Sequence, residues 1–153
     1  MSIIGIGLVA ILLVISLLHL YWGLGGFWPG TDARSLSERV AGTSRSVASK
    51  LVPCVMVGSA LAAAAAIVVL RHTVPPEGLS ALIIYGGYVT LMLVFGLRGL
   101  APYLTPAFNY ARATPFYALN RKYYAPLCLL IAAGFIIDFP PGIERFILNP
   151  FGV

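Results

Sequence analysis

Long apolar runs separated by short polar segments dominate the chain. Four nearly uncharged runs predict helices over about residues 3–24, 51–70, 79–97 and 123–139. A helix needs about 20 residues to cross a bilayer, with a range of roughly 17 to 25, so the fourth run is at the short limit. Because backbone groups in lipid must bond within their own segment, we predict an all-α polytopic membrane protein with four transmembrane helices, forming one domain over residues 1–153.

The composition agrees with this pattern. Apolar residues make up 59% of the chain and charged residues 10%, whereas soluble proteins carry roughly 25% charged residues. The net charge of +5 does not indicate nucleic-acid binding, because the basic residues lie in the gaps between apolar runs. The first run has no basic residue before it and ends in Tyr21 and Trp22, so we expect a retained helix rather than a signal peptide.

Basic residues are divided unequally between the two sides of the predicted membrane. Loop 1 (residues 25–50) and loop 3 (residues 98–122) hold Arg34, Arg39, Arg45, Lys50, Arg98, Arg112, Arg121 and Lys122. The opposite side holds only Arg71 and Arg145. The positive-inside rule therefore predicts that loops 1 and 3 are cytoplasmic and that both termini are outside. In a bacterium, the membrane would be the inner membrane and the outside would be the periplasm.

Loop 1 carries the signature of a short helix. Ser35 and Glu38 have the spacing of a capping box, with Ser35 as the N-cap. Leu36, Val40 and later apolar residues follow near helical spacing. One interpretation is an amphipathic helix lying on the inner leaflet, with its basic residues near anionic headgroups. The other is a mobile polar loop.

The two halves of the chain partly coincide when one is shifted by 73 residues. This shift places Gly23 on Gly96 and Pro53 on Pro126. Chance agreement in a membrane sequence rich in Gly and Leu is one explanation. The other is an internal repeat of two tandem two-helix hairpins, related by an axis along the membrane normal.

His19 is the strongly polar, titratable side chain within the first predicted helix. Intramembrane ionisable groups are costly and usually face protein or a water-filled cavity. Apart from Ser16, this helix offers no polar group to satisfy the histidine, so we expect its partner to come from another helix or from water. Five further residues are expected at the same depth near the inner leaflet: Trp22, Cys54, Arg98, Tyr124 and Cys128.

These six residues form the candidate ligand-binding site. Arg98 would give the site a positive wall suited to an anionic headgroup or a carboxylate. The alternative is structural: a histidine bonded to a backbone carbonyl or a tyrosine, beside two inert buried thiols. Aromatic residues crowd the same side of the membrane, either as an interfacial belt or as the lining of a pocket at headgroup level.

Several more specific chemistries lack the residues that they need. A haem site of the b type needs a second axial histidine, but His72 is expected on the opposite side of the membrane from His19. Thiol redox catalysis prefers a close cysteine pair, and the His and Cys spacing gives no argument for zinc. A small proton-coupled exporter would need a carboxylate within a span. Asp138 is the only candidate, and it is expected at the outer edge of the fourth span. We predict no catalytic residue, no cofactor and no metal.

Two stretches carry a family resemblance. They are His19-Leu-Tyr-Trp-Gly-Leu-Gly-Gly26 with Pro29, and Asn120-Arg-Lys-Tyr-Tyr-Ala-Pro-Leu-Cys128. Both resemble a bacterial family of small four-helix integral membrane proteins known as a domain of unknown function. The resemblance covers essentially the whole chain and implies a fold but no activity. Members often carry a basic residue after the Gly-Gly pair, where this chain has Phe27.

Three classes of function remain open. The favoured hypothesis is a non-enzymatic accessory subunit, or a binder of a lipid or other small amphiphile at the cytoplasmic leaflet. The alternatives are a membrane-embedded enzyme or redox component that uses the depth of His19, and a small oligomeric transporter. The expected partners are membrane lipids and either another membrane protein or further copies of the chain, not nucleic acid.

Overall fold

The computed structural model describes residues 1–45 and 50–142, and every regular element in these ranges is helical. The α-helices are α1 (Ile3–Gly23), α2 (Ala33–Val40), α3 (Leu51–Thr73), α4 (Gly78–Leu104), α5 (Pro115–Leu119) and α6 (Ala125–Ile137). Loop 3 contains two further helical segments, the 3-10 helix η1 (Pro106–Ala111) and the π-helix η2 (Asn120–Tyr124).

Three helices of the described chain, α1, α3 and α4, are long and apolar enough to cross a membrane. This finding confirms three of the four predicted spans and indicates membrane association. Helix α6 has 13 residues, and such a helix is about 20 Å long, whereas the hydrocarbon of a bilayer is about 30 Å thick. It continues without a break from α5 and η2, so the helical path runs from Pro115 to Ile137.

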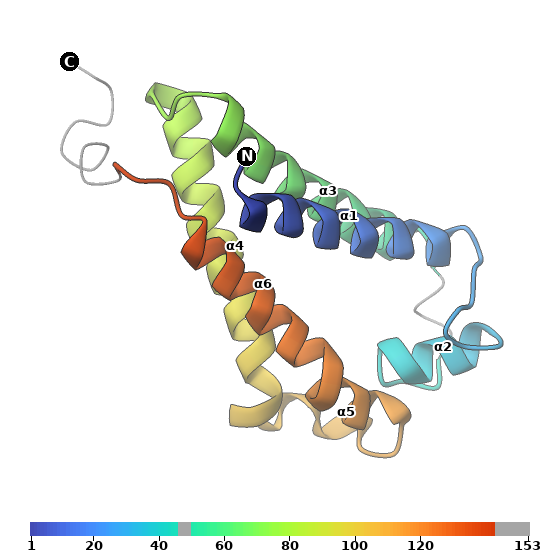
Figure 1. Ribbon diagram of the computed structural model, residues 1–153. Helices are drawn as coiled ribbons and strands as arrows, with labels where there is room; N and C mark the ends of the chain where they lie inside the picture. The colour runs from blue at the N-terminus through green and yellow to red at the C-terminus, as the bar shows by residue number, and fades with distance from the viewer. Residues whose placement is uncertain (46–49, 143–153) are drawn as a thin grey trace.

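The long helices form two arms (Figure 1). Helices α1 and α3 lie side by side as the first arm, and α4 and α6 form the second arm. The arms meet at the end that holds the N-terminus, here called the apex, and diverge toward the end that holds α2 and α5, here called the base. Buried apolar side chains from all four helices fill the apex: Leu8, Leu12, Ala64, Ala65, Val68, Ile84, Tyr88, Ile131 and Phe135.

The helices approach each other closely both within the first arm and between the two arms. Within the first arm, the hydroxyl of Ser16 donates to the carbonyl of Gly58 at 2.8 Å. A Cβ at Gly58 would lie 3.2 Å from the Leu20 side chain, so only glycine allows this separation without adjustment. Between the arms, a Cβ at Gly134 of α6 would lie 2.8 Å from the Leu8 side chain of α1. Small residues therefore determine where the arms touch.

Helix α2 joins the arms again at the base. Leu36 is buried against Trp22 and Cys54 of the first arm. From the segment that connects α4 to α6, the Tyr124 hydroxyl of η2 donates to the Arg39 carbonyl at 3.3 Å, and the Tyr110 hydroxyl of η1 donates to the Ala41 carbonyl at 3.1 Å. The helices therefore form a closed frame, joined at the apex by the core and at the base by α2.

The predicted helix of loop 1 exists, but its cap is one turn earlier than expected. Asp32 is the N-cap, and its carboxylate accepts from the Ser35 amide at 2.8 Å, while the Ser35 hydroxyl accepts from the Asp32 amide at 3.0 Å. Ser35 is therefore the third helical residue, and Glu38 instead pairs with Arg34 at 3.0 Å. The rest of the predicted apolar pattern includes residues 46–49, which lie outside the described residues.

Helix α4 is longer than the apolar run predicted. It continues past Arg98 to Leu104, with Pro102 inside its last turn, so Arg98 lies within the helix rather than at its end. The 73-residue repeat stays a prediction. The order of helices in the two arms is compatible with it, but Gly23 packs on Cys54, whereas a Cβ at Gly96 would meet nothing within 4 Å in the described structure.

Candidate functional sites

A buried carboxylate ties the four long helices together at the apex. The side chain of Asp138, which caps the C-terminus of α6, is 3% exposed. It accepts from the Tyr88 hydroxyl of α4 at 2.7 Å, from Nε2 of His72 in α3 at 3.1 Å, and from the hydroxyl of Ser2, the N-cap of α1. A buried charge requires such donors, because leaving it unpaired in a low dielectric is very costly.

Sequence reasoning missed this cluster. It placed Asp138 and His72 separately at the outer edge of the membrane and did not consider a contact between them. Their shared depth was the available signal, because a carboxylate and a histidine at one level of a four-helix protein are natural partners. Ser2 and Tyr88 offered no comparable signal, since hydroxyl groups are common at helix termini and within apolar spans.

His19 satisfies one ring nitrogen within its own helix. Its Nδ1 lies 2.8 Å from the Ile15 carbonyl oxygen and therefore donates to it, and its ring packs edge-on against Trp22 at 5.0 Å between centroids. The expectation that its partner comes from another helix or water was wrong for this nitrogen, because a helical side chain can bond the carbonyl four residues earlier. Nε2 is then an acceptor, and it has no protein partner in residues 1–45 and 50–142.

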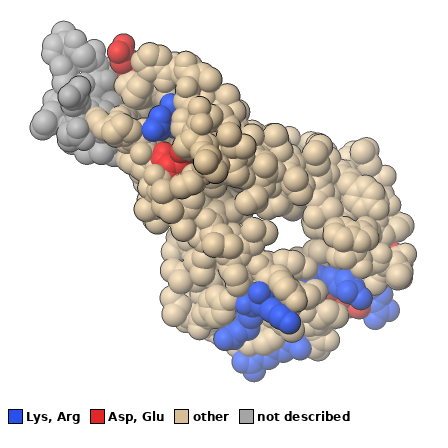
Figure 2. All heavy atoms as spheres, viewed as in Figure 1, with Lys and Arg blue, Asp and Glu red and all other residues tan. Residues whose placement is uncertain are grey.

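The face of α1 that carries His19 is directed toward the second arm. Leu8 marks this face, because it packs on Gly134 of α6. Ile15 follows Leu8 by seven residues and His19 follows Ile15 by four, which places each of them within about 20° of Leu8 around the helix. The arms diverge from Leu8 toward the base, so the face of α1 that carries His19 borders the space between the arms. Figure 2 shows this space as an opening through the molecule, here called the window.

The six predicted site residues divide between the arms. On the first arm, Trp22 Nε1 donates to the Trp28 carbonyl at 2.6 Å and the ring packs with Cys54, beside His19. On the second arm, Arg98 donates from Nη2 to the Asn120 side chain at 3.0 Å, and its guanidinium lies 4.8 Å from the Phe108 ring centroid.

The other two predicted residues also lie on the second arm. Tyr124 reaches α2 through its bond to the Arg39 carbonyl, and Cys128 lies one turn into α6. The hydrogen bonds and ring contacts of His19 and Trp22 join them to each other, to Ile15 and to Trp28, whereas those of Arg98 join it to Asn120 and Phe108. The structure therefore places these residues on opposite sides of the frame, and their binding role stays a prediction.

Positive charge is concentrated at the base. Figure 2 shows the Lys and Arg side chains gathered there, over the end that holds α2 and α5. Loops 1 and 3 carry eight basic residues against two acidic ones, Asp32 and Glu38. Glu38 pairs with Arg34, and the Asp32 carboxylate caps α2, a bond that lowers the pKa of Asp32 below its ordinary value. Most of the basic side chains therefore have no carboxylate partner in the described chain.

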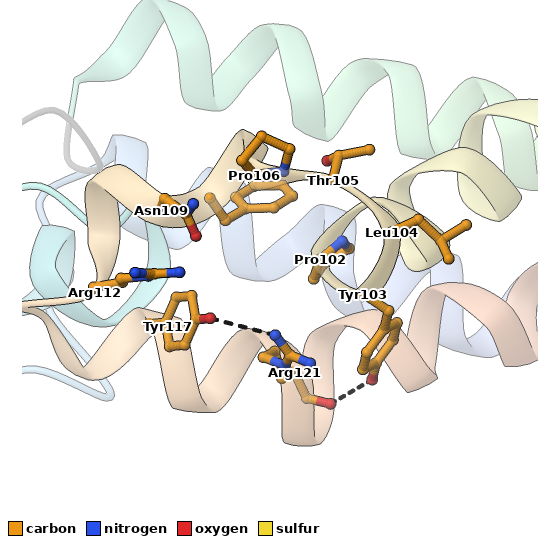
Figure 3. A pocket seen from close by; sticks show the side chains of 10 residues that line it. Pro102, Tyr103, Leu104, Thr105, Pro106, Asn109, Arg112, Tyr117 and Arg121 are labelled. Atoms are coloured by element: carbon orange, nitrogen blue, oxygen red, sulfur yellow. Dashed lines mark hydrogen bonds between the residues drawn. The ribbon is translucent and has the colours of Figure 1, made fainter.

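A cavity of about 260 Å³ opens among these charges, between the end of α4, η1 and α5 (Figure 3). Arg112 and Arg121 line it together with Tyr103 and Tyr117. Arg121 donates from Nη1 to the Tyr117 hydroxyl at 3.3 Å, and this bond lowers the pKa of the Tyr117 phenol below its ordinary value. The sequence analysis raised a pocket lined by aromatic residues on this side as one alternative. It did not name Arg112 and Arg121 as lining residues, because it treated loop 3 as a connection rather than as folded helical segments.

These features define a helical, membrane-associated protein with a frame of two arms. A hydrogen-bonded cluster around Asp138 lies at its apex, and positive charge is concentrated at its base. The chain belongs to the family described as Protein of unknown function (DUF3995), whose profile matches residues 12–135. The match includes both motifs that carry the family resemblance, so that expectation is confirmed. No curated protein and no solved structure matches the chain.

Proposed function

We propose that the protein is a non-enzymatic membrane protein that holds a lipid or other small amphiphile in the window, at the cytoplasmic leaflet. The fourth span of this proposal is α6, extended toward the cytoplasm by η2 and α5. The observation that carries the proposal is the closed frame around an opening, with the apex core on one side and α2 on the other.

The contents of such a window follow from its position. An opening bordered by a transmembrane helix lies in the hydrocarbon of the bilayer, where acyl chains are the surrounding solvent. Apolar side chains such as Ile15 favour contact with an acyl chain over contact with water, since burial of apolar surface is favourable by about 25 cal/mol per Å². An acyl chain is therefore the natural occupant.

The charge of the base supports an anionic headgroup on that amphiphile. The orientation proposed from the basic loops places the base in the cytoplasm of a bacterium, against the inner leaflet. Anionic lipids attract basic residues near the membrane surface by about 1 kcal/mol per Lys or Arg. His19 offers Nε2 inside the window, as an acceptor when the ring is neutral and as a donor when it is protonated.

Native mass spectrometry of the protein purified in mild detergent tests the proposal. We expect retained lipid on the unmodified chain and loss of most of it from His19→Phe, because the larger apolar ring removes the polar atom from the window. Leu17→Phe is the matched control. It introduces the same side chain on the opposite face of α1, at a residue that is 64% exposed, so lipid retention should not change.

Two results would contradict the proposal. One is an unmodified chain that retains no lipid. The other is a His19→Phe protein that remains folded, as judged by size exclusion and circular dichroism, and retains as much lipid as Leu17→Phe. A His19→Phe protein that fails to fold would assign His19 a structural role in α1 instead.

A further inference from the structure

We infer that the cavity lined by Arg112 and Arg121 is a binding site for a phosphate group, either on a lipid headgroup or as the free anion. The site lies on the second arm, in the segment that connects α4 to α6. It goes beyond the proposed function, because it does not depend on what occupies the window.

No carboxylate of the described chain pairs with the arginines of the cavity. In residues 1–45 and 50–142, the acidic side chains are Asp32, Glu38, Glu77 and Asp138. Asp138 is engaged at the apex, Glu38 pairs with Arg34, and Asp32 and Glu77 cap the N-termini of α2 and α4. Neither arginine of the cavity forms an ion pair within the described chain. Their charge is therefore available to an external anion.

Tyrosine rings hold the two arginines in place. The Arg121 guanidinium lies 5.3 Å from the Tyr103 ring centroid and 5.8 Å from that of Tyr117, and the Arg112 guanidinium lies 5.9 Å from the Tyr117 ring. The Tyr103 hydroxyl also donates to the backbone carbonyl of Arg121 at 2.5 Å. Cation–π contact uses the face of a guanidinium and leaves its N–H edge for other acceptors.

The size and the position of the cavity both suit a phosphate group. Small-molecule pockets usually measure about 300–1,000 Å³, so a cavity of about 260 Å³ suits a compact polar group rather than a whole amphiphile. Two guanidinium forks and the Tyr117 hydroxyl match the several acceptor oxygens of a phosphate. The cavity begins where α4 ends, beside Leu104, which is 74% exposed. This is where an apolar helix leaves the membrane, so the cavity lies at the level of lipid headgroups.

Binding is measured on the full chain in dodecyl maltoside, in a chloride buffer of constant ionic strength. Isothermal titration calorimetry with inorganic phosphate should show one saturable site. Arg112→Gln and Arg121→Gln should each weaken phosphate binding by about tenfold, which is the loss expected for one charge-assisted hydrogen bond. Arg34→Gln is the matched control, since this arginine pairs with Glu38 and lies away from the cavity, and binding should not change.

A second variant tests the site without removing an arginine. Asn109 lines the cavity, and Asn109→Asp would add a carboxylate of nearly the same shape. Phosphate binding should then be lost, because the new charge pairs with the arginines and repels the anion. Folding of each variant is verified by circular dichroism and size exclusion.

A second probe identifies the source of the phosphate group. The protein is offered equal amounts of phosphatidate and phosphatidylcholine in mixed micelles, and retained lipid is counted by native mass spectrometry. Preferential retention of phosphatidate that Asn109→Asp abolishes supports a lipid headgroup, whereas saturable inorganic phosphate without this preference supports a free anion. The inference is overturned if neither probe binds, or if Asn109→Asp and the double variant Arg112→Gln/Arg121→Gln bind both as Arg34→Gln does. Lipid loss in His19→Phe would be unaffected by that outcome, so the two proposals fail separately.

Discussion

The hydrogen bonds that Asp138 accepts at the apex predict that Asp138→Asn destabilises the fold through the loss of the negative charge alone. Asparagine has nearly the shape of aspartate, and its amide oxygen can replace the oxygen that accepts from Tyr88 and His72. Its NH₂ group then faces the Ser2 hydroxyl, which can rotate to accept. The contacts survive, but hydrogen bonds to a charged group, worth about 1.5–3 kcal/mol each, become neutral ones worth about 0.5–1.5 kcal/mol.

The free energy of unfolding should therefore fall by about 2–3 kcal/mol. For a chain of this size that corresponds to a drop of roughly 4 to 12 °C in the apparent Tm. Asp138→Leu should cost more, about 3–5 kcal/mol, because it leaves the donors of His72 and Tyr88 buried without an acceptor.

Thermal unfolding in dodecyl maltoside, followed by far-ultraviolet circular dichroism, measures these changes. Asp32→Asn is the matched control, because Asn and Asp are equivalent N-caps and this residue is exposed at the base. Its Tm should stay close to that of the unmodified chain. If Asp138→Asn melts together with Asp32→Asn, the carboxylate is not the element that holds the four helices at the apex.

Three further predictions concern other parts of the molecule. Reporter fusions within residues 75–78 and after the last residue should indicate the outside, and fusions in loops 1 and 3 the cytoplasm; a cytoplasmic C-terminus would refute the orientation. Gly58→Ala should destabilise the first arm by about 1–3 kcal/mol, because its Cβ would press on Leu20, whereas Gly86→Ala, which meets nothing within 4 Å in the described structure, should stabilise α4 by about 0.5–1 kcal/mol. Arg121→Gln should raise the pKa of Tyr117 toward its ordinary value of about 10, since the guanidinium favours the phenolate. The pKa of Tyr117 is measured as the difference in ultraviolet titration between proteins with Tyr117 and with Tyr117→Phe. An unchanged titration would exclude the hydrogen bond between Arg121 and Tyr117.

Hydropathy alone was sufficient to predict the long helices. The runs over α1, α3 and α4 were predicted within a few residues at most ends, because the cost of exposing backbone groups in lipid makes an apolar run of this length helical in any tertiary setting. The C-terminal end of α4 is the exception. Polar Arg98 suggested a boundary, but a long basic side chain is tolerated within a helix when it finds a partner, here the side chain of Asn120.

The sequence also predicted where each polar residue lies along its helix but not its neighbours in space. His19 was correctly assigned to the body of the first helix, yet only the structure shows that its Nδ1 bonds the Ile15 carbonyl. The contacts among Ser2, His72, Tyr88 and Asp138 join residues up to 136 positions apart, and no periodicity records such a pairing. Hydropathy is a local property summed along the chain, whereas the apex tie, the divergence of the arms and the phosphate cavity depend on which helix faces meet. That choice is made by small residues such as Gly58 and Gly134, whose effect is exerted on other helices, and it is therefore decided only in the tertiary structure.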